Sequence, residues 1–296
     1  MKEKLLYLLV SVCFISSYAQ TSSSFFKPSD SLNISRRNAV LITETALLGG
    51  GLVLLNRNWY NDKEKTSFHF NKDQNGWGLM DKAAHGFATY QLTRFSTEAL
   101  QWSGMSNNKS LLYGTIYGLG AVTAKELMDA HVKEWGWSWY DYGFNIIGSG
   151  LYVGQELLWK EQRIQPKFSY NNSKSKGVVT ENVGDNYGER LFKNYDGQTF
   201  WLSFNLNSFA KTTYIPNWLN FSVGYGVDGY LTNRQMAFVP QKSKSIYLSL
   251  DADLTKIKTQ SHFLRTLFSI CNTIKIPAPT IEFNSKRATK GHVLYF

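Results

Sequence analysis

The stretch LNFSVGYGVD (Leu219–Asp228) decides the fold of the second half of this 296-residue chain, because its apolar and polar residues strictly alternate. Alternation with a period of two predicts a β-strand that has one apolar and one polar face. The same alternation runs through residues 200–207 and 246–253. With about six strand candidates of this kind, residues 162–296 are predicted to form an antiparallel β-rich sheet or partial barrel.

Strands with one apolar and one polar face occur both in soluble sheets and in membrane barrels. A soluble sheet buries its apolar face, whereas a strand in a membrane barrel turns that face to lipid and its polar face to water. The last residues, Lys290–Phe296, resemble the C-terminal signal of outer-membrane barrel proteins, because spaced apolar residues end in an aromatic one. Membrane barrels begin at eight strands, which is more than the roughly six strand candidates of this chain. We therefore expect a membrane-associated segment, and the sequence leaves open whether it spans the membrane or lies against it.

Residues 37–161 have the spacing of helices and are predicted to form a bundle of about four. In residues 82–102, for example, apolar residues recur every three or four positions, which builds one buried helix face. The other predicted helices cover residues 39–55, 111–130 and 139–160. None of them contains 18 consecutive apolar residues, so a compact bundle is favoured over a polytopic membrane domain. Residues 39–55 are the main candidate for membrane insertion. The predicted fold class is α+β.

The N-terminus predicts export. Residues 1–19 have the lysines, the apolar run and the small residues of a secretory signal peptide, with cleavage after Ala19. Residues 20–36 are expected to be a polar leader. Cys13 is preceded by Val12, where lipoprotein processing requires a small side chain, so cleavage after Ala19 is favoured over lipidation. The expected location is the cell envelope, on the periplasmic side of or within the outer membrane.

The formal net charge of +10 bears on the partners of the chain. Its basic residues are scattered and accompany no nucleic-acid-binding module, so we expect no nucleic-acid partner. A membrane lipid or lipopolysaccharide surface is the favoured partner of an exported basic protein, and the alternative is an ordinary basic surface. Protein partners stay unknown. No cofactor motif is present, and Cys271 is the single cysteine after residue 19, which excludes an intramolecular disulfide in the mature chain.

Charged and polar residues stand among apolar ones in three short motifs on the predicted helices. Within each motif they are three or four positions apart, which places them on one helix face. A buried charge is costly unless it is paired. We therefore expect the three motifs to converge between the helices. Their residues are Asp81, Lys82 and His85; Lys125, Glu126 and Asp129; and Asp141 and Asn145.

These motifs resemble those of the uncharacterised envelope family that includes the YfiM lipoproteins, and more distantly those of VanZ-like proteins. The resemblance covers residues 77–155 and rests on Asp-Lys-x-x-His, Lys-Glu-x-x-Asp and Trp-Ser-x-x-Asp-x-x-x-Asn-x-x-Gly in that order. VanZ-like proteins are polytopic, whereas this chain has a predicted cleavable signal and a long β-rich extension. The resemblance implies an envelope compartment and no particular reaction.

Two roles for the motifs stay open. The favoured one is structural, a polar cluster between helices, with Lys82, Lys125, Asp129 and Asn145 as its binding or structural members. The alternative is a hydrolase or transferase that acts on a lipid or cell-wall precursor, with His85, Asp81, Glu126 and Asp141 as catalytic candidates. A divalent ion held by His85, Glu126, Asp129 and Asp141 is conceivable. No metal-binding spacing of real specificity is present, so no metal is predicted. Asp81 and Asp141 are also placed to cap their helices.

Overall fold

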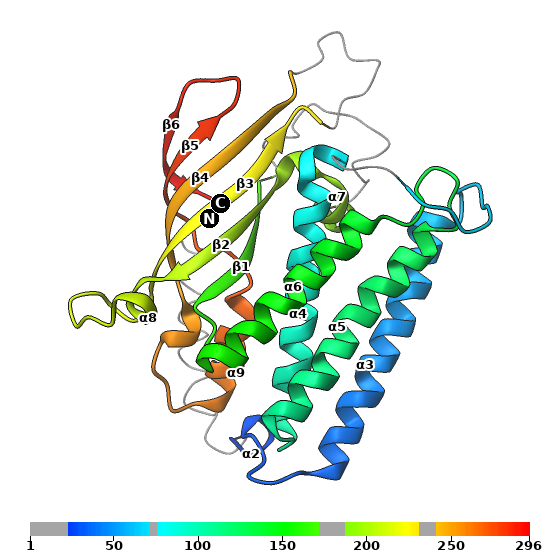
Figure 1. Cartoon of the computed structure of the whole chain (residues 1–296). Coiled ribbons are helices and arrows are strands. Elements are labelled where there is room, and N and C mark those ends of the chain that lie inside the picture. Colours follow the sequence, from blue (N-terminus) through cyan, green and yellow to red (C-terminus); the bar gives the residue numbers. More distant parts are fainter. Residues whose placement is uncertain (1–22, 72–75, 172–186, 231–240) are drawn as a thin grey trace.

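The computed structural model describes residues 23–71, 76–171, 187–230 and 241–296 (Figure 1). In this part of the chain helices come first and a six-stranded antiparallel sheet follows, which confirms the predicted α+β class. The strand order is β1-β2-β3-β4-β5-β6, and β6 does not pair with β1, so the sheet is open. The predicted signal peptide lies outside the described residues.

The helical half is a bundle of long helices that run alongside one another (Figure 1). Its central member is α4, which packs against both α5 and α6. A short helix, α2, lies in the predicted polar leader and packs on α4 through the rings of Phe25 and Trp102, 5.1 Å apart. The elements are α2 (Ser23–Phe26), α3 (Ile34–Leu55), η1 (Asn56–Tyr60), η2 (Gly76–Leu79), α4 (Met80–Trp102), α5 (Asn107–Asp129) and α6 (Trp139–Trp159).

Small residues let these helices approach closely. A methyl group on Gly148 of α6 would lie 2.1 Å from the carbonyl oxygen of Gly86 in α4, so no side chain fits between the two backbones. The contact places the first turns of α4 and α6 side by side. These first turns carry two of the three polar motifs.

The sheet is a simple meander with short helices in its connections. Its strands are β1 (Ile164–Tyr170), β2 (Gln198–Asn205), β3 (Leu219–Asp228), β4 (Ser243–Ala252), β5 (Ala278–Asn284) and β6 (Lys290–Tyr295). The connections contain α7 (Tyr187–Lys193), η4 (Tyr195–Gly197), α8 (Leu206–Ala210), η5 (Leu254–Lys256) and α9 (His262–Cys271). The outer edge of β1 is covered, because Phe168 exchanges backbone hydrogen bonds with Thr273 and Lys275. At the other edge a β-bulge interrupts the pairing of β6 with β5.

The two faces of the sheet are inverted relative to a soluble protein. The polar half of each alternation is buried, as at Ser203, Asn220 and Asp251, each at most 3% exposed. The apolar half points outward, and Leu250 and Ile281 are each 48% exposed. The predicted alternation is thus present, with its polar side inward.

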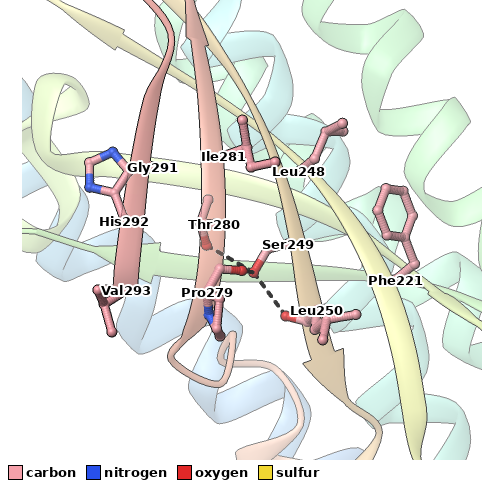
Figure 2. A pocket seen from close by; sticks show the side chains of 10 residues that line it. All are labelled: Phe221, Leu248, Ser249, Leu250, Pro279, Thr280, Ile281, Gly291, His292 and Val293. Carbon is pink, nitrogen blue, oxygen red and sulfur yellow. Dashed lines mark hydrogen bonds between the residues drawn. The ribbon is translucent and has the colours of Figure 1, made fainter.

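Only part of the apolar face is covered. The ring of Phe87 on α4 packs 5.9 Å from that of Phe168 on β1 and 5.6 Å from that of Phe200 on β2, and the two strand rings lie 5.4 Å apart. Across β3–β6 the same face forms a shallow groove of about 630 Å³. Figure 2 shows this groove, in which Phe221, Leu250 and other apolar side chains stand on neighbouring strands.

The bundle has the same inverted character. Large apolar side chains are exposed on α3, α5 and α6: Leu41, Ile42, Leu47, Val53, Leu54, Leu112, Ile116, Leu127, Ile146, Ile147, Leu157 and Leu158. The continuous helix Ile34–Tyr60 is long and apolar enough to cross a membrane by length and composition, and its most apolar 18 residues are not buried. The buried positions of α4 are mostly polar, among them Lys82, His85 and Arg94.

Candidate functional site

The three polar motifs meet at one end of the bundle. They come from the first turns of α4, the last turns of α5 and the first turns of α6, and these ends lie together near the top of Figure 1. All eight residues that the sequence singled out belong to this group, linked by the contacts below. We call them, with Tyr60 and Tyr195, the polar cluster.

Lys82 ties α4 to α6. Its ammonium group lies 2.8 Å from Asp141 Oδ1 and 3.1 Å from Asp81 Oδ2, and its side chain is only 2% exposed. Asp81 and Asp141 both lie in the first turn of a helix, where the helix dipole also favours a negative charge. The backbone N–H of Asp141 donates to the side chain of Ser138, which caps α6.

His85 joins all three helices. Its Nδ1 lies 2.9 Å from Asn145 Oδ1 on α6, and its Nε2 lies 3.2 Å from Lys125 Nζ and 3.4 Å from Glu126 Oε1 on α5. An ammonium group can only donate, so His85 accepts at Nε2 and donates from Nδ1. The imidazole is therefore neutral in this arrangement.

Lys125 closes the cluster on α5. Its ammonium group lies 2.6 Å from Asp129 Oδ2 and 3.2 Å from Glu126 Oε1. The hydroxyl of Tyr60, at the end of η1, donates to Asp129 Oδ1 at 2.5 Å. This bond attaches the end of the long N-terminal helix to the cluster.

The sequence analysis missed both tyrosines. The hydroxyl of Tyr195, in η4, donates to Asp81 Oδ1 at 3.2 Å, across 114 residues of chain. Neither Tyr60 nor Tyr195 lies in a motif with the residue it contacts, so spacing gave no signal. Burial raises the pKa of each phenol well above its usual value, and the nearby carboxylates raise it further. Both tyrosines are therefore hydrogen-bond donors in the cluster.

Burial and neighbouring charges give three carboxyl groups of the cluster different pKa values. Burial opposes the ionisation of Asp81, but the positive charges of Lys125 and Lys82, with the polar His85 ring beside them, outweigh it and lower its pKa to about 2. Burial raises the pKa of Glu126 to about 7, against the attraction of Lys125. Burial and the charge of Asp81 raise the pKa of Asp141. Asp81 is thus a permanent anion, whereas Glu126 titrates near neutral pH.

The basic groups of the cluster also differ in the direction of their pKa shifts. Burial and the charge of Lys125 lower the pKa of His85, which agrees with its neutral hydrogen-bonding role. Burial also opposes the charge of Lys125, but Asp129 and Glu126 outweigh it and raise its pKa well above the usual value. The cluster holds two fixed ammonium groups and one neutral imidazole.

Among the described residues, Asp81, His85 and Asp141 have the geometry that comes closest to a metal site. Each offers one ligand atom, and these atoms lie within 4.8 Å of one another. The ammonium group of Lys82 already contacts both carboxylates, and that of Lys125 contacts the imidazole. A divalent ion there would lie against two positive charges. The donors therefore suit a hydrogen-bonded ion-pair network better than a metal ion.

The cluster reaches solvent at two side chains. Lys125 is 33% exposed and Asp81 is 21% exposed, whereas Lys82, His85 and Glu126 are at most 6% exposed. Three buried atoms of the cluster have no hydrogen-bond partner among the described residues, Glu126 Oε2, Asp141 Oδ1 and Asn145 Nδ2. Asp141 Oδ1 is ion-paired with Lys82, so Glu126 Oε2 and Asn145 Nδ2 are the two with neither kind of partner in the described part of the chain. The cluster thus satisfies most of its polar groups internally and leaves one acceptor and one donor free.

A second polar network lies under the sheet, and the sequence analysis did not find it. Lys167 and Asp251, both fully buried, form an ion pair of 2.9 Å between β1 and β4. Lys275 donates to the backbone carbonyls of Leu250 and Ile276, and burial lowers its pKa to about 8. The signal was present as the polar half of each alternating strand. This network holds the inward face of the sheet together.

Comparison with known protein families places part of this chain beside a described family. No curated protein and no solved structure matches this chain. Residues 68–155 match the family model DUF2279, described as a predicted periplasmic lipoprotein. The matched segment is under a third of the chain and contains α4, α5 and most of α6, with the three polar motifs. The chain is thus similar, through its polar cluster, to an uncharacterised family of envelope lipoproteins, which supports an exported, periplasmic location.

Proposed function

We propose that this chain is a non-catalytic envelope protein associated with the outer membrane. In this proposal the sheet rests its apolar face in lipid, and the polar cluster holds the helical bundle together. The motif resemblance to YfiM-like and, more distantly, VanZ-like proteins belongs to the same proposal. The similarity of residues 68–155 to a periplasmic family supports the compartment.

The single observation that carries the proposal is the inverted sheet. On the outward face of β2, β4 and β5, Leu202, Ile246, Leu250, Ile281 and Phe283 are each 43–48% exposed. A soluble sheet of this composition would bury that face. An exposed, contiguous apolar patch marks an interaction surface, and strands that are apolar outside and polar inside are typical of contact with lipid.

The length of the strands favours one-sided contact. A strand that crosses the bilayer has about 9–11 residues, and of the strands in the described residues β3 and β4, with 10 residues each, reach that length. The sheet has six strands and is open, whereas membrane barrels begin at about eight. The proposal is therefore a sheet seated in lipid by its apolar face.

The structural role of the cluster rests on its contacts. Its side chains link η1, α4, α5, α6 and η4, and the buried charges of Lys82 and Asp141 are paired with each other. A buried pair is a weak source of stability but is costly to break. The cluster would thus fix the relative positions of the elements rather than stabilise them strongly.

Charge placed on the apolar face tests the proposal. The double variant Ile246→Glu/Ile281→Glu puts two carboxylates on neighbouring outward positions of β4 and β5. The apolar helix Ile34–Tyr60 is unchanged in this variant and can itself contact a membrane. We therefore expect a larger soluble share of the variant than of the unaltered protein in disrupted cells, with the same proteolytic resistance. Asn107→Glu/Asn108→Glu adds the same charges at exposed positions of α5 and should stay in the membrane fraction. A folded Ile246→Glu/Ile281→Glu protein with the same soluble share as the unaltered protein would contradict the seating of the sheet in lipid.

A second candidate function has one observation in its favour. The free acceptor of Glu126 and the free donor of Asn145 are both fully buried beside His85. Unpaired buried polar atoms next to a neutral imidazole are also what a small polar substrate would require. This favours the alternative of a hydrolase or transferase acting on a lipid or cell-wall precursor. His85 variants, discussed below, separate the two functions.

A further inference from the structure

Basic residues gather at one end of the apolar face. The turn between β5 and β6 folds against the start of β4, because the backbone N–H of Ser285 donates to the carbonyl of Lys244 and the backbone N–H of Lys244 donates to the Ser285 hydroxyl. The side chain of Arg287 reaches across to Ser243 at 3.3 Å. These contacts bring together four exposed basic residues, which we call the basic rim: Lys242, Lys244, Lys286 and Arg287.

The rim carries an unbalanced positive charge. Asp228 pairs with Arg287, and Glu282, the other acidic residue nearby, is buried against Ser245 and His292. Within the described residues, Lys244 and Lys286 form no ion pair. At least two ammonium groups are thus exposed and uncompensated at this end of the sheet.

The basic rim and the groove both include residues on the outward face of β4. Lys244 lies on the outward face of β4, two residues before the exposed Ile246 and four before Leu248, which lines the groove. Successive outward residues of a strand are about 7 Å apart. The charged group of Lys244 and the apolar side chain of Leu248 would therefore lie about 14 Å apart on one continuous surface. A phospholipid likewise has a charged headgroup at one end and apolar chains at the other.

We propose that the basic rim binds the phosphate headgroups of anionic phospholipids while the groove beside it contacts their acyl chains. This inference rests on the proposed function, since it assumes that the apolar face lies in lipid. Charge complementarity is the argument for this occupant, because exposed lysines beside an apolar surface attract an anionic bilayer. Each basic residue near such a surface strengthens binding about fivefold at low salt.

Vesicle partitioning tests this inference. The full mature chain is diluted from detergent into vesicles of phosphatidylcholine, with or without phosphatidylglycerol. We expect a preference for the anionic vesicles of at least tenfold at low salt, which fades in 0.5 M salt because screening shortens the range of the charges (about 10 Å at 0.1 M). Lys244→Gln/Lys286→Gln should lose most of the preference and bind neutral vesicles as before.

Matched controls assign the effect to the rim. Lys211→Gln/Lys258→Gln removes two exposed lysines from the connections at the opposite end of the sheet and should keep the preference. An unaltered preference in Lys244→Gln/Lys286→Gln, or the same loss in both double variants, would overturn the rim. Loss of vesicle binding in 10 mM inorganic phosphate would also overturn the rim. Binding to vesicles that contain lipopolysaccharide but not to vesicles that contain phosphatidylglycerol would overturn it too. Failure of the unaltered protein to bind neutral vesicles would instead overturn the lipid seating of the sheet.

Discussion

Gly118 of α5 lies against Thr93 of α4 so closely that a methyl group on the glycine would fall 2.3 Å from Thr93 Oγ1 and 2.8 Å from its backbone nitrogen. The backbone atom cannot rotate away. The close approach of α4 and α5 therefore depends on the absence of a side chain at this position, and this approach brings Glu126 and Lys125 to His85.

Replacement of Gly118 by alanine should separate the two helices and destabilise the bundle. We expect a loss of about 1–3 kcal/mol, the usual cost of overpacking. Gly120 is the matched control, since it lies on the same helix and has nothing within 4 Å of its added methyl group. Gly120→Ala should instead stabilise the helix by about 0.5–1 kcal/mol. Unfolding of the detergent-purified proteins measures both, and equal effects would contradict the close packing.

Lys82→Met should leave two carboxylates without this ammonium partner. It removes the ammonium group that pairs with Asp141 and Asp81 while keeping a side chain of similar length. Loss of one partner of a buried pair costs about 3–5 kcal/mol. Lys133→Met, which breaks a pair with Glu64 that is more than 60% exposed at both ends, should cost under about 1 kcal/mol. A Lys82 variant as stable as the Lys133 variant would mean that the cluster is not structural.

The raised pKa of Glu126 predicts a pH dependence of the free energy of unfolding. In the folded protein Glu126 keeps its proton up to about pH 7, whereas in the unfolded chain it loses it near pH 4.5. Between these values the folded state binds more protons, so the contribution of Glu126 to stability decreases as pH rises. It is present below about pH 4.5 and lost by about pH 7.

Glu126→Gln isolates this contribution, because other groups of the cluster titrate too. The variant should gain stability relative to the unaltered protein between pH 5 and pH 8, by an amount on the order of 2 kcal/mol. Chemical unfolding at both pH values provides the difference. A difference that is independent of pH would show that Glu126 ionises normally.

His85 separates the structural function from the catalytic one. In the structural role, His85→Ala leaves Asn145 and Lys125 without their imidazole partner and should lower the melting temperature by several degrees. In the catalytic role, it should abolish rescue of the growth or envelope defect of a deletion strain while the melting temperature stays nearly unchanged. Melting temperature and complementation are therefore measured on the same variant.

The mature N-terminus is a prediction outside the described residues. Cleavage after Ala19 gives a chain that begins at Gln20, and mass spectrometry of the purified protein checks it. A mature chain that begins at an acylated Cys13 would show lipoprotein processing, as the description of the matched family suggests for its members.

The helices and the meeting of the motifs could be predicted because both depend on local spacing. The helix expected at residues 139–160 is α6, and Asp141 and Asn145 share the face that Lys82 and His85 contact. Tyr195 could not be predicted as a partner of Asp81, because 114 residues separate them and only the tertiary structure brings them together.

The strands were predictable from their alternation, but the direction of their faces was not. The alternation of Asn220 with Phe221 is the same whether the asparagine or the phenylalanine points inward. The interior is decided by the network beneath, in which Asn220 donates to Ser203 and Ser203 donates to Asp251. Lys167 and Asp251 come from different strands, so their ion pair has no local sequence signal either.

The inverted sheet has a consequence for the heat capacity of unfolding. An ordinary protein gains about 12–15 cal/mol/K per residue when it unfolds, because newly exposed apolar surface raises the heat capacity while polar surface lowers it. Here the outward apolar side chains, such as Leu250 and Ile281, are already half exposed, and unfolding uncovers the polar side chains of Ser203 and Asp251. The inward face also buries Trp201, Tyr247 and Tyr295, whose exposure raises the heat capacity. The polar side chains therefore offset part of the apolar contribution, and the stability curve of the sheet should be flatter than that of a domain held by a purely hydrophobic core.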